Sequence, residues 1–281
     1  MPELVTPLTA QVKVAERLLA IDALRGIALV LMALDHSALF SNVGIQAEHI
    51  VGSTTQLEGW PHWVTGLLSN IAAPTFWLIS GISVALYVNG QRRKGASEWA
   101  ISRYLLTRAG AILLLDVCLV SFLWKVENRI YFYQFGVLSS IAVSLVLLTF
   151  LRFLPKRAIL GLAVALLLGY QWLWAHVPIS YNRPYAFWEA LWFTYTLRTS
   201  PDVWFPVLGW FGLMGSGFVL GQFVTLPTLQ HPRVWVAAGL SLLAAWMALR
   251  LAGGYGDMVP YKLTDSWPYF FIMSKWPPSL T

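Results

Sequence analysis

The hydrophobic residues of the chain lie in long, nearly uninterrupted runs, and short polar segments separate these runs. Each run has about 20 residues, the length that an α-helix needs to cross a hydrocarbon core of roughly 30 Å. The runs lack the polar alternation of membrane β-barrel strands, and a helix satisfies its own backbone hydrogen bonds in lipid. The pattern therefore predicts membrane-spanning helices. The seven predicted spans are Leu18 to Phe40, Trp63 to Val88, Ala109 to Trp124, Phe132 to Leu151, Ala158 to Ala175, Phe205 to Leu226 and Val234 to Ala252.

The composition agrees with this pattern, because 57% of the 281 residues are hydrophobic and only 11% are charged. Soluble domains carry about 25% charged residues. No repeat, low-complexity tract or soluble segment interrupts the series of runs. We therefore predict an all-α fold, a polytopic transmembrane helix bundle that forms a single integral membrane domain over residues 1–281. The sequence ends shortly after the start of a new segment, SKWPPSL (residues 274–280), so either this tail is natural or the bundle is truncated before further spans.

Lysine and arginine are distributed unevenly between the two sets of connecting segments. Cytoplasmic loops are enriched in these residues, so the more basic set is predicted to be cytoplasmic, together with the N-terminus. The basic residues form short clusters between spans instead of a patch with interleaved aromatic residues, and we predict no nucleic-acid partner. The residues of the basic set are Lys13, Arg17, Arg92, Arg93, Lys94, Arg103, Arg152, Lys156, Arg157 and Arg233.

The first predicted span contains four ionisable residues, Asp22, Arg25, Asp35 and His36. A charge at the centre of a membrane helix costs roughly 2.5 to 3.5 kcal/mol, so such residues need a partner or a function. Arg25 and His36 are eleven positions apart, which gives them nearly the same helical angle and separates them by about 16 Å along the axis. Asp22 is three residues before Arg25, within reach of an ion pair. This pair has a structural and a functional interpretation, equally supported by the sequence.

His36 is the main catalytic candidate. A neutral imidazole can accept a proton near pH 7, which suits a general base or a transient acyl acceptor. Asp35 would raise the basicity of the ring if it reached it, although adjacent helical residues point about 100° apart. Asp116 stands in the apolar run AILLLDVCLVSF, where we expect it to pair with Arg25 or His36, as scaffold or in catalysis.

Other chemistries find less support in the sequence. No pair of histidines or carboxylates has the spacing of metal ligands, so we predict no metal. The single cysteine, Cys118, provides no disulfide framework. His62 precedes the second span near Glu58 and is a weaker functional candidate, since an interfacial histidine is usually just solvated.

Four segments together carry a family resemblance. They are RLLAIDALRGIALVLMALDHSALF (residues 17–40), AAPTFWLISGISVALY (72–87), FPVLGWFGLMGSGFVLG (205–221) and SKWPPSL. These segments resemble bacterial membrane proteins related to heparan-alpha-glucosaminide N-acetyltransferase, a group of transmembrane acyltransferases. The opening motif, with Asp-Ala-Leu-Arg-Gly followed by Asp-His, is the most specific of the four.

The resemblance implies an enzyme that takes an acyl group, usually acetyl, from acetyl-CoA or another acyl-CoA on the cytoplasmic side. The implied acceptor is a hydroxyl or amine of a saccharide or glycan on the outer side, and the implied location is the bacterial inner membrane. By motif position the catalytic residues are His36, Asp35 and Asp116. The donor-binding residues are Arg25 and Asp22, together with Arg92 and Arg93 of the basic loop after the second span.

The sequence departs from this family in two places that bear on the site. Relatives often have histidine where this chain has Asn70, and they commonly have further spans after the Pro-Pro-Ser-Leu segment. The catalytic histidine of the animal enzyme lies just before the second span, a region where this chain has His62. The choice between His36 and His62 therefore stays open.

Two other functions fit the same intramembrane charges. A transporter or lipid flippase would use them to bind a solute or relay protons, although the sequence has no internal repeat and no pair of interrupted spans. A non-catalytic membrane scaffold is the third interpretation, if the spans found in relatives are needed to complete the site.

Overall fold

The chain is almost entirely helical. The computed structural model describes residues 8–41, 49–50, 60–123, 133–176, 187–196, 201–256, 267–271 and 274–276. Its α-helices are α1 (Leu8–Ser41), α2 (Trp60–Ser69), α3 (Ala72–Arg93), α4 (Glu98–Leu114), α6 (Val137–Leu151), α7 (Lys156–His176), α8 (Phe187–Phe193), α9 (Val207–Phe223) and α10 (Pro232–Ala252). A π-helical segment, η1 (Leu115–Val120), continues α4, and two 3₁₀ turns, η2 (Pro227–Gln230) and η3 (Trp267–Phe271), flank α10.

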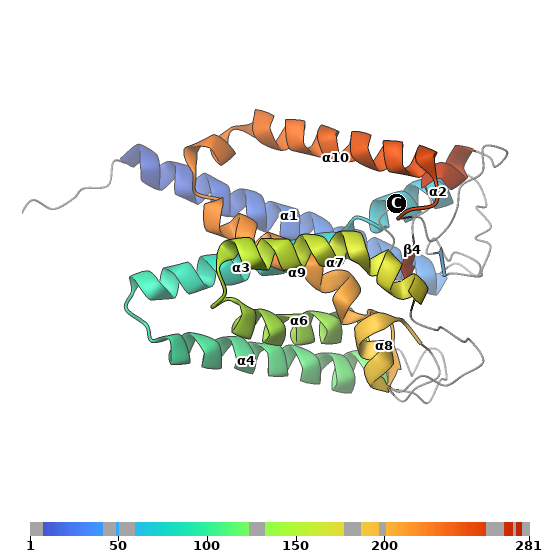
Figure 1. Cartoon of the computed structure of the whole chain (residues 1–281), viewed down its shortest axis with the longest axis horizontal. Coiled ribbons are helices and arrows are strands. Elements are labelled where there is room, and N and C mark those ends of the chain that lie inside the picture. Colours follow the sequence, from blue (N-terminus) through green and yellow to red (C-terminus); the bar gives the residue numbers. More distant parts are fainter. Residues whose placement is uncertain are drawn as a thin grey trace, which may run out of the picture.

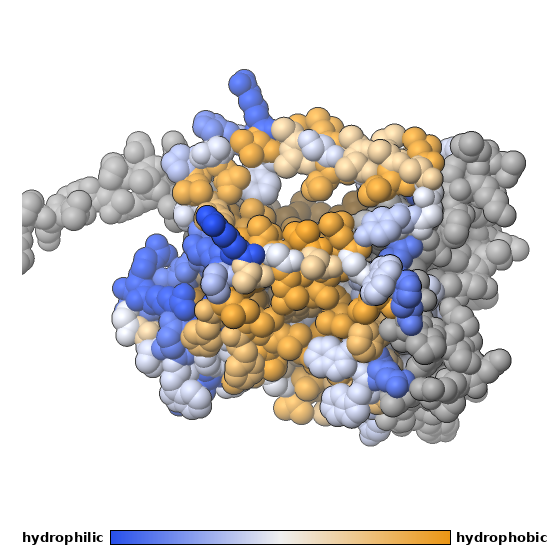
Figure 2. Space-filling model, viewed as in Figure 1, coloured by the Kyte–Doolittle hydropathy of each residue, from blue (hydrophilic) through white to orange (hydrophobic). Residues whose placement is uncertain are grey.

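The long helices lie side by side along one common direction (Figure 1). Four helical segments of the described chain are long and apolar enough to cross a membrane, namely Trp63–Arg93, Glu98–Leu123, Lys156–Trp174 and Pro232–Ala252. α6 and α9 are apolar but shorter. Figure 2 shows the apolar surface over the middle of these helices, with hydrophilic residues gathered toward one end. The prediction of a helical integral membrane protein is confirmed.

Two predicted spans differ from the structure in detail. The predicted span Trp63 to Val88 corresponds to the apolar segment Trp63–Arg93, in which a turn at Asn70 and Ile71 separates α2 from α3. Pro74 explains the break, since proline has no N–H for the carbonyl of Asn70 and its ring crowds that carbonyl. The span predicted from Ala109 begins earlier, at Glu98, because the Ser97 side chain accepts a hydrogen bond from Ala100 N at 3.2 Å and starts α4.

α3 and α9 form the centre of the bundle and approach each other backbone to backbone. A Cβ atom on Gly81 would lie 2.0 Å from the carbonyl oxygen of Met214, and one on Gly217 would lie 2.1 Å from that of Leu78. On the other side of α9, a Cβ on Gly212 would lie 2.8 Å from the carbonyl oxygen of Ala163 in α7. Small residues permit this close packing of membrane helices, where no hydrophobic effect draws them together.

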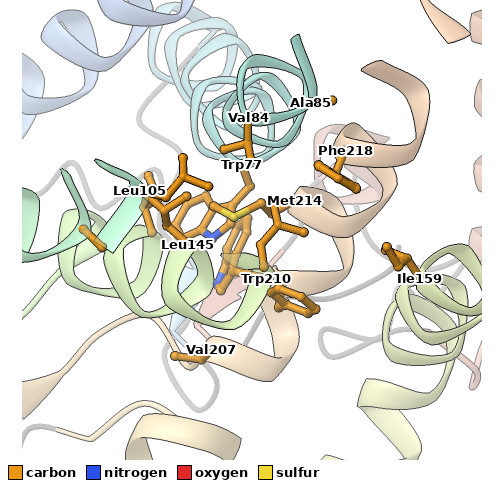
Figure 3. Packing of buried hydrophobic residues seen from close by; sticks show 14 of the residues in the cluster. Trp77, Val84, Ala85, Leu105, Leu145, Ile159, Val207, Trp210, Met214 and Phe218 are labelled. Atoms are coloured by element: carbon orange, nitrogen blue, oxygen red, sulfur yellow. The ribbon is translucent and has the colours of Figure 1, made fainter. Parts of the chain in front are cut away.

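A pair of buried tryptophans fills the space beside this contact. The rings of Trp77 and Trp210 stack with centroids 4.6 Å apart, and Met214 is fully buried next to them. Figure 3 shows the two indoles between α3, α6 and α9, with Leu145 of α6 close by. This cluster joins the central helix pair to α6 and α4.

One end of the bundle is basic. The α3–α4, α6–α7 and α9–α10 connections meet there (Figure 1). We call it the basic end, and its residues are Arg92, Arg93, Lys94, Arg152, Lys156, Arg157 and Arg233. Glu98 ties two of its arginines together: its Oε1 atom accepts from Arg92 Nε at 2.6 Å, and its Oε2 atom pairs with the buried guanidinium of Arg152. Arg152 also donates to Ser102 Oγ at 2.8 Å.

The opposite end holds the described strands, which the sequence did not predict. β1 (His49–Ile50) pairs in parallel with β4 (Ser274–Trp276), and β2 (Gln134–Phe135) pairs in parallel with β3 (Asp202–Val203). The second pair is extended by hydrogen bonds from Asp202 N to Tyr133 O at 2.6 Å and from Trp204 N to Phe135 O at 3.1 Å. These short strands anchor the segments that precede α6 and α9.

Candidate functional site

Asp22 and Arg25 form the predicted ion pair on α1, with Arg25 Nη1 2.6 Å from Asp22 Oδ1. The same guanidinium reaches across to α3, where its Nη2 atom donates to Ser83 Oγ at 2.8 Å. Ser83 in turn donates to Ile79 O at 2.7 Å, so it is free to accept from Arg25. The pair therefore links α1 to the central helix α3, which favours its structural interpretation.

Asp35 and His36 lie near the other end of α1, away from the basic end, and both are half-buried. α1 packs against α2 as well as α3, and α2 contains His62, whose side chain lies outside the described residues. The two candidate histidines thus belong to neighbouring helices.

Asp116 has different partners from those predicted. Its Oδ2 atom accepts from the backbone N–H groups of Gly136 at 2.9 Å and Ser139 at 2.8 Å. The carboxylate is 1% exposed and caps the N-terminus of α6, where free N–H groups and the helix dipole favour a negative charge. The predicted pairing of Asp116 with Arg25 or His36 was wrong, because the spacing of residues along the chain does not show that the start of α6 lies beside η1.

We expect Asp116→Ala to lower the melting temperature, since it leaves two buried N–H donors without an acceptor; loss of such a cap costs about 0.5 to 2 kcal/mol. Asp116→Asn keeps an acceptor oxygen and is expected to melt close to the wild type. Thermal unfolding of the detergent-solubilised protein measures both. If Asp116→Asn is stable but inactive in acyl transfer, the carboxylate has a catalytic role; equal destabilisation by both changes would contradict the capping role.

The π-helical segment η1 provides the geometry for this cap. Asp116 lies within η1, and Ser121 directly follows it. The Ser121 hydroxyl is 3.0 Å from the carbonyl oxygens of Asp116 and Gln134 and accepts from Gln134 N at 3.2 Å. Isolated π-helical turns are rare and are often found at functional sites. Here the turn fastens α4 to the strand that leads into α6.

Several buried polar groups without partners lie in the part of the bundle where α3, α6 and α9 begin, opposite the basic end. Among the described residues, the Nε1 atoms of Trp77 and Trp210 and the hydroxyls of Ser140 and Ser144 have no hydrogen-bond partner. An unsatisfied buried polar group costs about 1 to 3 kcal/mol, so such groups indicate where water or a polar ligand atom is needed. These residues carry no signal in the sequence, since serine and tryptophan in apolar runs are common in membrane helices.

Asp202 and Asn70 also lie at the end of the bundle opposite the basic end. Asp202 is 7% exposed, its Oδ1 atom has no partner, and burial raises the pKa of its carboxyl to about 6. Asn70 is buried at the break between α2 and α3, and its Oδ1 atom is also without a partner. A carboxyl group of this kind can hold or release a proton near neutral pH.

The predicted donor-binding residues lie in two separate parts of the structure. Arg92, Arg93 and Lys94 are exposed at the turn after α3, with Arg92 held by Glu98, whereas Asp22 and Arg25 lie on α1 against α3. Within the described ranges no group of three or more histidine, cysteine or acidic residues is arranged to hold a metal ion.

A family model for the catalytic domain of heparan-alpha-glucosaminide N-acetyltransferase matches residues 17–250. The chain belongs to this family. Curated proteins and solved structures give no match to the chain. The matched range begins at the charged face of α1 and ends at Arg250 in α10, so it includes Asp22, Arg25, His36 and Asp116. The resemblance inferred from the motifs is confirmed, and the protein is an integral membrane protein of an acetyltransferase family.

Proposed function

We propose that this protein is a membrane acyltransferase that moves an acyl group, acetyl in the first instance, from acyl-CoA to a hydroxyl or amine of a saccharide. The donor binds at the basic end, which faces the cytoplasm of a bacterial cell, and the acceptor binds at the opposite end. The observation that carries the proposal is the division of chemistry between the two ends of a chain from this family: cations at one end, and His36 with unpartnered buried polar groups at the other.

The basic end suits the donor because CoA carries several phosphate groups. Arg93 and Lys94 are exposed there, and Glu98 already fixes Arg92, so the turn offers both free and oriented cations. Arginine binds phosphate with two parallel hydrogen bonds, and a cluster of cations attracts anions from solution. Arg25 of α1 is also assigned to the acyl-CoA side, with Asp22 holding its guanidinium.

The opposite end suits the transfer step. His36, oriented by Asp35 or by a group on another helix, takes the proton from the acceptor hydroxyl or amine as the nucleophilic oxygen or nitrogen attacks the thioester carbonyl. The C–S bond then breaks, CoA leaves as the thiol, and the proton from the acceptor ends on the CoA sulfur. In the alternative route the imidazole first carries the acyl group itself. His62 is the competing candidate for the same role.

Membranes that contain the protein, incubated with radiolabelled acetyl-CoA, test the proposal. Acetylated glycan or acetyl-protein in amounts above those of membranes without the protein is the expected result. Solute flux or lipid movement across the membrane with no transfer of label would overturn it.

Arg25→Gln is expected to raise the KM for acetyl-CoA by roughly 10- to 100-fold, because one charge-assisted contact to an anionic donor contributes about 1.5 to 3 kcal/mol. The KM for the acceptor should change little. Steady-state kinetics with each substrate varied in turn measure both values.

Ser83→Ala is the matched control for Arg25→Gln, since it removes the contact of Arg25 with α3 and leaves the charge in place. It is expected to lower stability slightly and to leave the KM for acetyl-CoA unchanged. If Ser83→Ala reproduces the kinetic effect of Arg25→Gln, the arginine acts by fastening α1 to α3 and the assignment to donor binding fails.

A transporter is the second candidate, and the interrupted helix α2–α3 favours it. The break at Asn70 and Ile71 places an unpartnered amide oxygen within an apolar segment, as in the discontinuous helices that bind solutes in transporters. Such helices usually occur in pairs, and α2–α3 is not matched by a second interrupted span among the described helices. The radiolabel experiment above separates the two functions.

A further inference from the structure

The turn between α3 and α4 has a shape that its own backbone determines. Gly95 has a φ of 76°, and its N–H donates to Arg92 O at 3.0 Å, as is common where a glycine ends a helix. Ser97 then caps the start of α4. Arg92 in the last turn of α3 and Glu98 in the first turn of α4 are therefore held on the two sides of a fixed turn, beside the end of α6 (Figure 1).

A single carboxylate joins a buried arginine to an exposed one at this turn. Arg152 follows α6, its side chain is fully buried, and its Nη1 atom pairs with Glu98 Oε2. Its Nη2 atom donates to Glu98 O at 3.2 Å and to Ser102 Oγ at 2.8 Å. The remaining oxygen, Glu98 Oε1, accepts from Arg92 Nε at 2.6 Å. Glu98 cannot turn away from Arg92 without leaving a buried cation unpaired, which is strongly unfavourable.

The guanidinium of Arg92 keeps one edge for a ligand. The bond through Nε sets the orientation of its plane, while its Nη1 and Nη2 atoms have no partner in the part of the chain that the structure describes, and the side chain is 42% exposed. We call these two atoms the free edge of Arg92. Two parallel N–H groups match the oxygen atoms of a phosphate. Because Glu98 already orders the arginine, less side-chain entropy is lost when an anion binds.

We propose that Glu98 and Arg152 are positioning residues of the donor site, which hold Arg92 so that its free edge binds the 3′-phosphate of CoA. This inference rests on the proposed function, because it takes acyl-CoA as the ligand. The nucleotide is the part of CoA furthest from the thioester, so it stays at the basic end when the acyl group reaches into the bundle. Its 3′-phosphate is a monoester, a group with a charge of about −1.5 to −2 and three acceptor oxygens.

Glu98→Gln separates positioning from simple attraction, because the two predict opposite signs. If net charge alone drew CoA to the basic end, loss of a carboxylate beside the phosphate would tighten binding. If Glu98 positions Arg92, CoA binds about 2- to 10-fold more weakly, since the ligand then has to order the arginine. Calorimetric titration of the detergent-solubilised full chain with CoA measures this without acyl transfer. Binding as tight as that of the wild type, or tighter, would overturn the proposal.

Arg92→Lys is the second variant, and it keeps the charge of an exposed side chain while it removes the fork. We expect the wild type to bind CoA roughly 10- to 100-fold more tightly than dephospho-CoA, which lacks the 3′-phosphate. Arg92→Lys should weaken the binding of CoA roughly tenfold, since one of two parallel hydrogen bonds is lost, and leave that of dephospho-CoA unchanged. Equal affinity of the wild type for the two ligands would contradict the assignment of the phosphate.

Arg103→Lys is the matched control, because Arg103 is an exposed arginine of α4 that has no ion pair among the described residues. The same chemical change there should leave both affinities at their wild-type values. If Arg103→Lys and Arg92→Lys have equal effects, the loss reflects the general charge of the basic end, and the site at Arg92 is wrong.

Two further results separate this site from a lipid site and from the reaction itself. Phosphatidic acid also carries a phosphate monoester; if it stabilises the protein in nanodiscs through Arg92, and Arg92→Lys leaves CoA binding unchanged, the ligand is a lipid headgroup and the proposal is wrong. CoA binding that depends on Arg92 and Glu98 without transfer of labelled acetyl groups would support the site and end the proposed acyltransferase. Transfer of label with an unchanged KM for acetyl-CoA in both variants would end the site alone.

Discussion

Gly217→Ala is expected to prevent normal packing of the bundle, although it adds a single methyl group. The new Cβ would lie 2.1 Å from Leu78 O, so α9 and α3 have to move apart along their contact. Overpacking of this kind costs about 1 to 3 kcal/mol and occasionally more. Here the nearest atoms to the new methyl group belong to the backbone of Leu78, which has no rotamer to change. The expected result is a melting temperature lowered by several degrees, with loss of the symmetric peak in size-exclusion chromatography.

Gly110→Ala provides the comparison, since Gly110 is also within a helix and has open space where its Cβ would be. Alanine favours the helical conformation over glycine, so this variant should melt at or above the temperature of the wild type. A Gly217→Ala protein as stable as Gly110→Ala would mean that α3 and α9 are further apart than described.

His36→Ala is expected to reduce acyl transfer by about 10² to 10⁴-fold, the usual contribution of general acid–base catalysis. The protein should still fold and bind acetyl-CoA, because the donor contacts lie at the other end of the bundle. Transfer of labelled acetyl groups measures the first effect, and the protection of the protein against thermal unfolding by acetyl-CoA measures the second. A stable and fully active His36→Ala protein would end the assignment.

A His62→Ala variant, measured in the same transfer assay as His36→Ala, decides between the two candidate histidines. His231→Ala is the control, because His231 is exposed at the basic end and belongs to neither proposed site. Its activity should match that of the wild type. If His62→Ala loses activity and His36→Ala does not, the catalytic base belongs to α2.

The helices were largely predictable from the sequence because membrane spans depend on local composition. Leu18 to Phe40 lies within α1, and the predicted start of the last span at Val234 is two residues from that of α10. The Asp22–Arg25 pair was predictable for the same reason, since residues three apart on a helix are neighbours.

The partners of Asp116 and Arg25 on other helices were not predictable, because they depend on which helices pack together. Asp116 contacts the N-terminus of α6 and Arg25 contacts Ser83, and neither contact has a signal in the spacing of the residues. The turn before α3 did have a signal in the sequence, namely Pro74, although it was not predicted. The strand pairs, of two or three residues each, are too short for any periodicity to appear.

The backbone contact between α3 and α9 also restricts how the protein can move. Carbonyl groups meet glycines at Gly81 and Gly217, so a slide of one helix past the other would drive the flanking side chains into backbone. The two helices therefore behave as a single rigid body. Conformational change during a reaction cycle has to come from helices with looser contacts, above all α1 and α10, which move relative to this rigid pair.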